Sequence, residues 1–427
     1  METIADPATL PNATSAPASV EGATVEATEA TGLKPLAVSL YIPFCLKKCG
    51  FCDALVFDQP AVTLAESYTK ALLTEVESLA EDLAEYQVTT LEVCGGSPSL
   101  LGGRVLRELL DFVRGRLNVA PNCETTLELA PVNINISMFD ALQRCGVSRL
   151  EFEQETFDAF QSEMLAKGYT PGALEDAVPV AKGSRFTDFG VSLLYGLPGQ
   201  GVPSIETGVN TCAELGATHI KFAPLRLTPG TTVREEHDRQ LASGTQRSPR
   251  YVYPDDEKVA RLYRAGVELL ESRGYRRYTQ FHFAKEGFEA RLVHDGCAAV
   301  DSVGFGLGAV SRYEGVMCRN SSDMATYLAE SGDYTKVLAE FKELSPAEVA
   351  RDALARGLFA IEGVGRTEFE ERYGMSVEAC LPADGLPEGW LETDATTDRV
   401  RLTLEGGRHY EEVRDAIIRD GVAKKCI

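Results

Sequence analysis

Short apolar segments alternate with amphipathic ones from Lys34 to about Phe222. The apolar segments have the length of strands and span residues 36–42, 89–94, 124–129, 148–152, 188–194 and 218–223. Between them, apolar residues recur at steps of three and four, which is typical of helices, at Leu64–Leu83, 103–117, 136–145, 156–166, 171–182 and 203–215. Six consecutive strand–helix units predict an α/β fold with a parallel sheet, either a barrel or an open part-barrel. In such sheets, the loops after the carboxyl ends of the strands carry the functional residues.

Three cysteines lie within eight residues directly after the first expected strand, in Tyr41-Ile-Pro-Phe-Cys-Leu-Lys-Lys-Cys-Gly-Phe-Cys52. Thiolates at the spacing of Cys45, Cys49 and Cys52 suit a metal ion or an iron–sulfur cluster, and Gly50 lets the backbone fold tightly between two of them. Zinc is one alternative, although zinc sites usually add a second Cys pair or a His, and no second half lies nearby. Core cysteines without a ligand are another alternative. We favour a four-iron cluster, in which three cysteines would leave one iron open to another molecule.

The composition restricts the partners and the compartment. The 427 residues are enough for two domains, and 44% of them are apolar and 25% charged. A net charge of −22 argues against nucleic acid or an anionic membrane surface as the main partner. No apolar run is long enough to cross a bilayer, and no signal peptide opens the chain. The other eight of the eleven cysteines are scattered singly, as expected of reduced thiols in a cytoplasmic protein.

Composition also divides the chain. Residues 1–33 contain five acidic side chains, no Lys or Arg and almost no large apolar group, so they predict a disordered tail. A core domain is expected over 34–315. Within it, 225–254 resembles an irregular crossing, followed by a helix at Asp255–Arg273 and a strand at Tyr275–Phe283. Residues 345–427 predict a small separate domain of helices with a strand at Val400–Leu404.

The cysteine motif, with Phe51 before its last Cys, resembles that of radical S-adenosylmethionine (SAM) enzymes. More narrowly, Ile42-Pro-Phe-Cys45 resembles the motif of the oxygen-independent coproporphyrinogen III oxidase family, which includes related heme chaperones. The resemblance implies a partial (β/α)6 barrel like that of triosephosphate isomerase, with a small helical or winged-helix-like C-terminal domain. It also implies a 4Fe-4S cluster on the three cysteines and SAM on the open iron. An electron from a donor such as flavodoxin or ferredoxin would cleave SAM to methionine and a 5′-deoxyadenosyl radical.

Further matches to that family follow in order along the chain. Cys94-Gly-Gly-Ser-Pro-Ser99 resembles a turn that meets the SAM amino group, and Glu128 matches a glutamate that holds the SAM ribose. On their own residues, these segments could equally be a plain strand–helix turn and a solvated side chain. Leu193–Gln200, Gly304–Ser311 and Arg401–Gly406 resemble later parts of the family pattern. The cofactor contacts implied by the resemblance are Gly95, Gly96, Glu128, Lys167 and Phe51.

Five residues depart from the family pattern near the expected site. Tyr41 replaces a His, Ser39 a Tyr, Ser192 an Asp, Glu155 a Gln and Lys167 an Arg. Lysine keeps the positive charge but lacks the planar fork that binds a carboxylate with two hydrogen bonds. We expect SAM binding to survive with altered affinity and orientation.

Two further departures bear on the substrate. Ala54 stands where the decarboxylating oxidase has a fourth Cys. The chaperones hold heme with a His-Asn-x-x-Tyr-Trp segment, and the nearest counterpart, His294-Asp-Gly-Cys-Ala-Ala299, lacks the aromatic pair. The leading hypothesis is a radical SAM enzyme acting on a tetrapyrrole, similar to coproporphyrinogen III oxidase. The alternatives are a heme chaperone, and a methyltransferase or heme ring-opening enzyme built on the same core.

Overall fold

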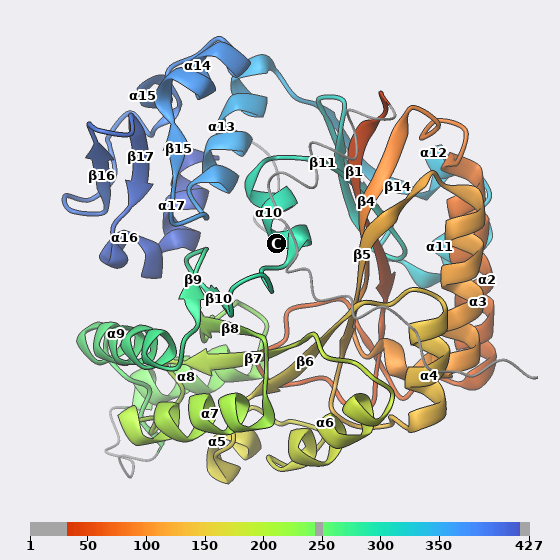
Figure 1. Ribbon diagram of the computed structural model, residues 1–427, viewed down its shortest axis with the longest axis horizontal. Coiled ribbons are helices and arrows are strands. Elements are labelled where there is room, and N and C mark those ends of the chain that lie inside the picture. The colour runs from red at the N-terminus through yellow and green to blue at the C-terminus, as the bar shows by residue number, and fades with distance from the viewer. Residues whose placement is uncertain (1–31, 244–250, 419–427) are drawn as a thin grey trace, which may run out of the picture.

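The computed structural model describes residues 32–243 and 251–418. The predicted disordered tail therefore lies outside the described residues, except for its last two positions. The largest element is a 12-stranded sheet with the order β14-β13-β12-β11-β1-β4-β5-β6-β7-β8-β10-β9. In Figure 1 this sheet curves strongly, and helix α10 (Arg291–Cys297) lies on its concave side.

The six predicted strands form the middle of the sheet and pair in parallel, in chain order. They are β1 (Lys34–Ile42), β4 (Tyr86–Gly95), β5 (Val119–Leu129), β6 (Arg149–Glu155), β7 (Phe189–Tyr195) and β8 (His219–Pro224). β1 pairs on its other side with β11 (Asp301–Phe305), and β8 pairs with β10 (His282–Ala284), so β1 and β8 do not meet. The predicted part-barrel is confirmed, in its open form.

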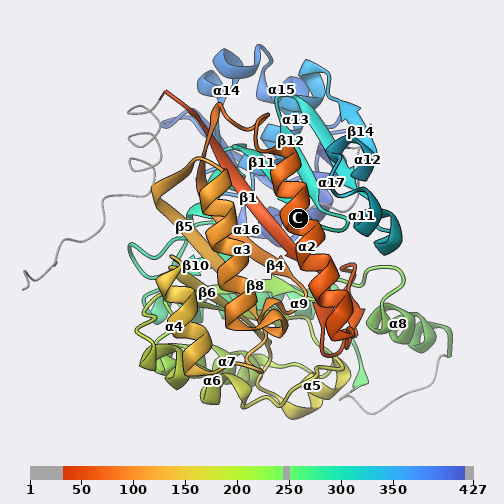
Figure 2. The same ribbon diagram turned by 90° about the vertical axis from the view of Figure 1, so that its right-hand side faces the viewer.

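Helices cover the convex face of the sheet, and Figure 2 shows α2 and α3 across β1, β4 and β5. Helix α3 buries Leu106, Leu109, Leu110 and Val113, which is the three-and-four spacing that predicted it. Helix α2 ends at Leu79, four residues before the predicted end. The helices of the repeat are α2 (Val62–Leu79), α3 (Gly102–Arg116), α4 (Ile136–Arg144), α5 (Ala159–Met164), α6 (Ala173–Gly183) and α7 (Val202–Leu215).

Two predictions beyond the repeat need correction. The expected irregular crossing at 225–254 contains helix α8 (Thr232–Ser243), whose only buried residue is Val233, so it has no apolar periodicity to reveal it. The expected strand at Tyr275–Phe283 is two short antiparallel strands, β9 (Arg276–Arg277) and β10. Between them, Thr279 Oγ1 accepts the backbone N–H groups of Phe281 and His282 and holds a turn. The predicted helix that precedes β9 is present as α9 (Asp256–Ser272).

The segment after β11 widens the sheet with antiparallel strands and two short helices. These elements are β12 (Val310–Tyr313), β13 (Val316–Asn320), α11 (Met324–Glu330), α12 (Tyr334–Val337) and β14 (Leu338–Glu343). Residues 316–343, which the predicted domain boundaries leave unassigned, thus contribute two strands to the main sheet.

The C-terminal elements surround their own apolar cluster, which includes Leu354, Phe369 and Val413 as well as Phe281 of the β9–β10 turn. In Figure 1 they lie above the open side of the curved sheet. They are α13 (Pro346–Gly357), β15 (Val364–Gly365), α14 (Arg366–Tyr373), α15 (Val377–Cys380), β16 (Leu391–Asp394), β17 (Arg399–Leu402), α16 (Leu404–Arg408) and α17 (Tyr410–Ile417). Across the described part of the chain, no helix has the length and apolarity that crossing a bilayer requires.

A buried glutamate ties helix α2 to the late glycine-rich segment. Glu75 accepts hydrogen bonds from the backbone N–H of Gly306 at 2.9 Å, from Asn320 Nδ2 at 2.6 Å and from the Tyr327 hydroxyl at 2.5 Å. Burial raises the pKa of its carboxyl from the usual 4.5 to about 7, although the three donors oppose this shift.

We expect Glu75→Ala to lower the free energy of unfolding by roughly 2–4 kcal/mol, because buried donors lose their acceptor. Since the folded-state pKa lies above the unfolded one, this carboxyl makes the wild type less stable as pH rises from 4.5 to about 7, and the variant should lose that slope. Urea denaturation at several pH values measures both effects. Glu77→Ala is the control, because Glu77 lies on the same helix in an exposed pair with Arg116 and should change little. Equal losses in the two variants would contradict the assignment.

Candidate functional site

The cysteine loop follows β1, at the carboxyl ends of the parallel strands. Cys45 ends the short strand β2 (Phe44–Cys45), which pairs with β3 (Phe57–Asp58). The backbone N–H of Gly50 donates to Leu165 O at 2.7 Å, and its carbonyl accepts from Val233 N at 3.0 Å. The loop is therefore fixed to the end of α5 and the start of α8 by bonds that involve no thiol.

All three thiols of the loop are half-buried and free. Burial raises the pKa of Cys45 to about 11 and of Cys49 to about 12, and it also raises the pKa of Cys52. Within the described ranges, the ligand groups whose atoms all lie within 4.8 Å of one another do not include these cysteines. The three sulfurs thus do not meet the close mutual spacing of ligands around one zinc ion, whereas an iron–sulfur core offers a separate iron to each thiolate.

The turn after β4 presses against the start of this loop. Gly96 N donates to Ile42 O at 2.8 Å, and Ser97 N donates to Phe44 O at 2.6 Å. A Cβ atom at Gly96 would lie 2.4 Å from Phe44 O, and Gly95 has a φ of 110°. The structure brings the two predicted glycines beside the cysteine loop. The close packing of the turn against this loop leaves no room for a side chain at either position, whether or not a cofactor is bound.

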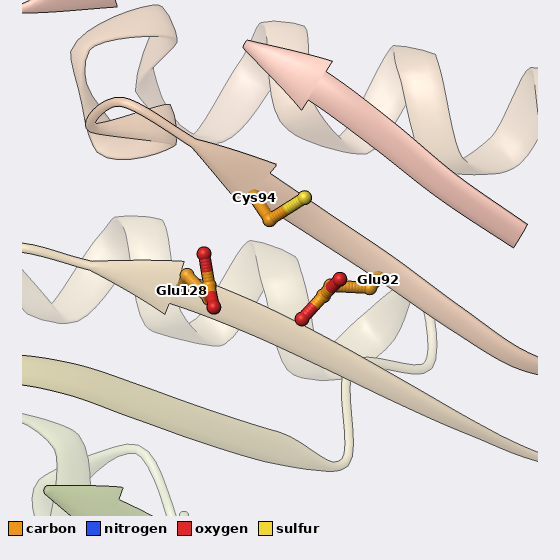
Figure 3. A group of neighbouring side chains, drawn as sticks. All are labelled: Glu92, Cys94 and Glu128. Carbon is orange, nitrogen blue, oxygen red and sulfur yellow. The ribbon is translucent and has the colours of Figure 1, made fainter. Parts of the chain in front are cut away.

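Glu128, at the end of β5, faces Glu92 and Cys94 of β4 (Figure 3), and their ligand atoms lie within 4.8 Å of one another. Burial and the neighbouring carboxylates raise the pKa of Glu128 well above its usual value, and burial raises that of Glu92. Sequence reasoning found Glu128, named Cys94 only as the first residue of the glycine turn and missed Glu92. Their spacing of two on one strand, which puts both side chains on one face, is the signal that was available.

A cavity of about 410 Å³ opens between the concave face of the sheet, helix α10 and the C-terminal helices. Its polar lining comes from β4, β5, β6, β7, β8, β10 and β12 and from α13 and α17, and includes Glu92, Glu128, Glu151, Glu153, His219, Lys221, His282, Arg312, Arg356 and Arg414. A second cavity of about 250 Å³ reaches the cysteine loop at Phe51 and Cys52. Glu153, Ser192, Lys221, His282, Phe359 and Tyr410 line both, so the two spaces are neighbours.

The acidic and basic groups of the cavity are arranged in networks. His219 lies between Glu151 and Tyr278, with Nδ1 3.2 Å from Glu151 Oε1 and Nε2 2.8 Å from the tyrosine hydroxyl. Burial alone would raise the pKa of Glu151, but His219 and Arg149 outweigh it and lower the pKa. For Lys221, burial favours the neutral amine, but the surrounding carboxylates of Glu153 and Glu128 prevail and raise its pKa. The cavity thus keeps charged groups of both signs.

Lys167 and Glu155, two of the departures from the family pattern, form a buried ion pair. Lys167 Nζ also lies 4.5 Å from the centre of the Tyr169 ring and 5.8 Å from that of Phe51. Burial raises the pKa of Glu155 to about 7 against the opposing effect of Lys167. The structure therefore places predicted residues Lys167 and Phe51 together at the loop, with the lysine already paired.

The histidine that sequence reasoning singled out for heme does not line either cavity. His294 stacks on Tyr278 with ring centres 5.0 Å apart, whereas Leu292, Val293 and Cys297 of the same helix line the larger cavity. His282, which sequence reasoning missed, lines both.

Comparison with known proteins agrees with this geometry. The radical SAM superfamily model matches residues 39–207. The heme chaperone HemW of Escherichia coli (strain K12) is 28% identical over 277 residues, which cover 65% of this chain and 70% of that protein. HemW of Bacillus subtilis (strain 168) is 24% identical over 386 residues, covering 89% of this chain and 98% of that protein.

Among solved structures, coproporphyrinogen III oxidase (HemN) from Escherichia coli, described as a radical SAM enzyme, superposes with a TM-score of 0.73. The superposition covers 93% of both chains at 19% identity, so it shows the shared fold. This chain therefore contains a radical SAM domain, is a homologue of the HemW heme chaperones and has the fold of HemN.

Proposed function

We propose that this chain is a heme-binding radical SAM protein, which holds the tetrapyrrole in the cavity beside its cysteine loop. The names of its relatives support heme handling of the chaperone kind. The observation that carries the proposal is the pair of neighbouring cavities, the smaller beside Phe51 and Cys52 and the larger lined by histidines and arginines. Its larger part lies in the range of about 300–1,000 Å³ typical of small-molecule sites.

The lining suits a flat, largely apolar molecule with carboxylate groups. Phe359, Leu292 and Val293 provide apolar walls. Arg312 and Arg356 share one carboxylate, at 3.5 Å and 3.6 Å from Asp352, so this side of the cavity has a surplus of positive charge. Guanidinium groups bind carboxylates with paired hydrogen bonds, and heme carries two propionates.

In this proposal the predicted cofactor residues keep their roles. The cluster and SAM would supply one-electron chemistry, and the protein would supply position and shelter from water. Cys45, Cys49 and Cys52 would hold the 4Fe-4S cluster; Gly95, Gly96, Glu128, Lys167 and Phe51 would line the SAM site. Of these, Lys167 would act mainly as a buried positive charge beside Cys49, because its ammonium is committed to Glu155.

A second candidate is an enzyme that cleaves SAM and acts on the tetrapyrrole, as an oxidase of the coproporphyrinogen type, a methyltransferase or a heme ring-opening enzyme. The proximity of the smaller cavity to Cys52 favours it, because a bound molecule would lie next to the cluster. The Glu151–His219–Tyr278 network would then hold or move a proton at the His219 ring nitrogens.

One anaerobic experiment separates the two candidates. The protein is reconstituted with iron and sulfide, reduced and given SAM with either ferric heme or coproporphyrinogen III. Heme bound at one per chain, without tetrapyrrole-dependent 5′-deoxyadenosine, supports the chaperone. Release of 5′-deoxyadenosine that rises manyfold with a tetrapyrrole supports the enzyme. The proposal would be refuted if the protein showed no heme binding and no tetrapyrrole-stimulated release of 5′-deoxyadenosine.

A further inference from the structure

The five histidines of the chain differ in their access to the cavity. They are His219, His237, His282, His294 and His409, and only the first and third line it. The Nε2 atom of His219 is hydrogen-bonded to Tyr278, and its Nδ1 is fully buried, 3.2 Å from Glu151 Oε1. Of the cavity's two imidazoles, His282 is therefore the one with a nitrogen to offer to a ligand.

We infer that His282 binds the iron of the heme through Nε2, an inference that rests on the proposed function. The structure holds this ring by its other nitrogen, since Nδ1 lies 2.8 Å from Thr279 Oγ1. Within residues 32–243 and 251–418, the Nε2 atom has no hydrogen-bond partner. It is not one of the fully buried polar atoms without a partner, so a ligand in the cavity can reach it. In the free protein the Thr279 hydroxyl, which already accepts two backbone N–H groups, is placed to donate its proton to Nδ1. Iron on Nε2 would take the other tautomer, whose proton lies on Nδ1 and faces Thr279 Oγ1, so that the Nε2 lone pair binds the metal.

The surroundings of His282 also favour iron ligation. Burial, reinforced by the neighbouring His219, lowers the pKa of His282 well below its usual value, so the ring is the neutral imidazole that metals bind. The His219 ring stacks on it at 5.4 Å with an interplanar angle of 18°, and the Phe359 ring meets it edge-on at 5.6 Å. These two ring contacts and the turn closed by Thr279 fix the direction of Nε2.

The position differs from the one that the chaperone motif suggests. His282 lies on β10, opposite Lys221 of β8, the last strand of the parallel series, whereas the counterpart of the chaperone motif lies on α10. The same cavity carries Arg312 and Arg356, so an iron-bound heme would find both a ligand and a carboxylate-binding surface in one space.

The test is a ferric heme titration of the reconstituted protein, followed by absorption difference spectra and pulsed EPR. In wild type labelled with ¹⁵N-histidine, the heme iron should show coupling to an imidazole nitrogen. His282→Ala should weaken heme binding by more than about tenfold and lose that coupling. Added imidazole should restore the wild-type spectrum, which a misfolded variant would not allow.

Two other histidines serve as comparisons. His237→Ala, on helix α8, and His294→Ala should keep wild-type heme affinity and spectrum, and all variants should keep the cluster absorption. Loss of the imidazole signal in His294→Ala alone, or a thiolate-type spectrum from Cys297, would overturn the inference while leaving heme binding intact. A wild type that binds no heme would instead refute the proposed function.

Discussion

Cys49→Ala should leave the protein folded but without an iron–sulfur cluster. The backbone around this residue is held by the hydrogen bonds of Gly50 to Leu165 and Val233, so loss of the thiol removes a ligand and spares the loop. After anaerobic reconstitution, bound iron should fall from about four per chain to well under one. The broad visible absorption that dithionite bleaches, and the slow cleavage of SAM, should disappear with it.

Cys212→Ala is the matched control for this loss. Cys212 is a fully buried thiol on α7, where alanine suits the helix, and it lines neither of the two cavities described above. It should keep the iron content and the absorption of the wild type. A Cys49→Ala protein that still binds four irons would show that the loop does not hold the cluster, whereas equal losses in both variants would point to a folding defect.

The repeat of the fold was predictable because its signals are local. Each strand of the part-barrel is a short apolar run, and each covering helix, such as α3, shows its buried face at regular spacing. Helix α8 and the division of the expected strand into β9 and β10 were not predictable from the sequence. Helix α8 buries only one residue, and the turn between β9 and β10 depends on the side chain of Thr279. Local patterns do not report such elements.

The cysteine loop and the glycine turn could also be read from the sequence, because each is contiguous. The interior of the cavity could not, since its groups come from separate strands that meet only in the folded sheet. The departures from the family pattern show this best. Ser39 Oγ contacts Glu92 at 3.3 Å, Ser192 Oγ contacts Glu153 at 3.1 Å, and Lys167 pairs with Glu155. These three substituted residues each meet a carboxylate, whereas the Tyr41 hydroxyl donates to Leu55 O at 3.2 Å, so most of the changes belong to one acidic interior.

The buried pair explains why a second substitution should have a large effect. Lys167→Met should lower the free energy of unfolding by about 3–5 kcal/mol, because Glu155 would remain buried without its partner. The side chains of Lys167 and Glu155 are only 3% and 2% exposed, so solvent cannot replace the lost charge. Urea denaturation measures the loss. Lys336→Met is the control, since Lys336 forms an exposed pair with Asp333 and should change stability little.

The pH dependence distinguishes an unpaired charge from a simple packing defect. In the wild type the folded-state pKa of Glu155 is raised to about 7, and without Lys167 it should rise further. A carboxyl whose pKa is higher in the folded state destabilises the protein progressively as pH rises from its unfolded value to its folded value. The loss in Lys167→Met should therefore be smaller near about pH 5 than near about pH 8. The double variant Lys167→Met/Glu155→Gln should recover most of the stability at the higher pH. A loss of stability that does not depend on pH, and that Glu155→Gln does not recover, would mean that the packing of the lysine and not its charge supports the site.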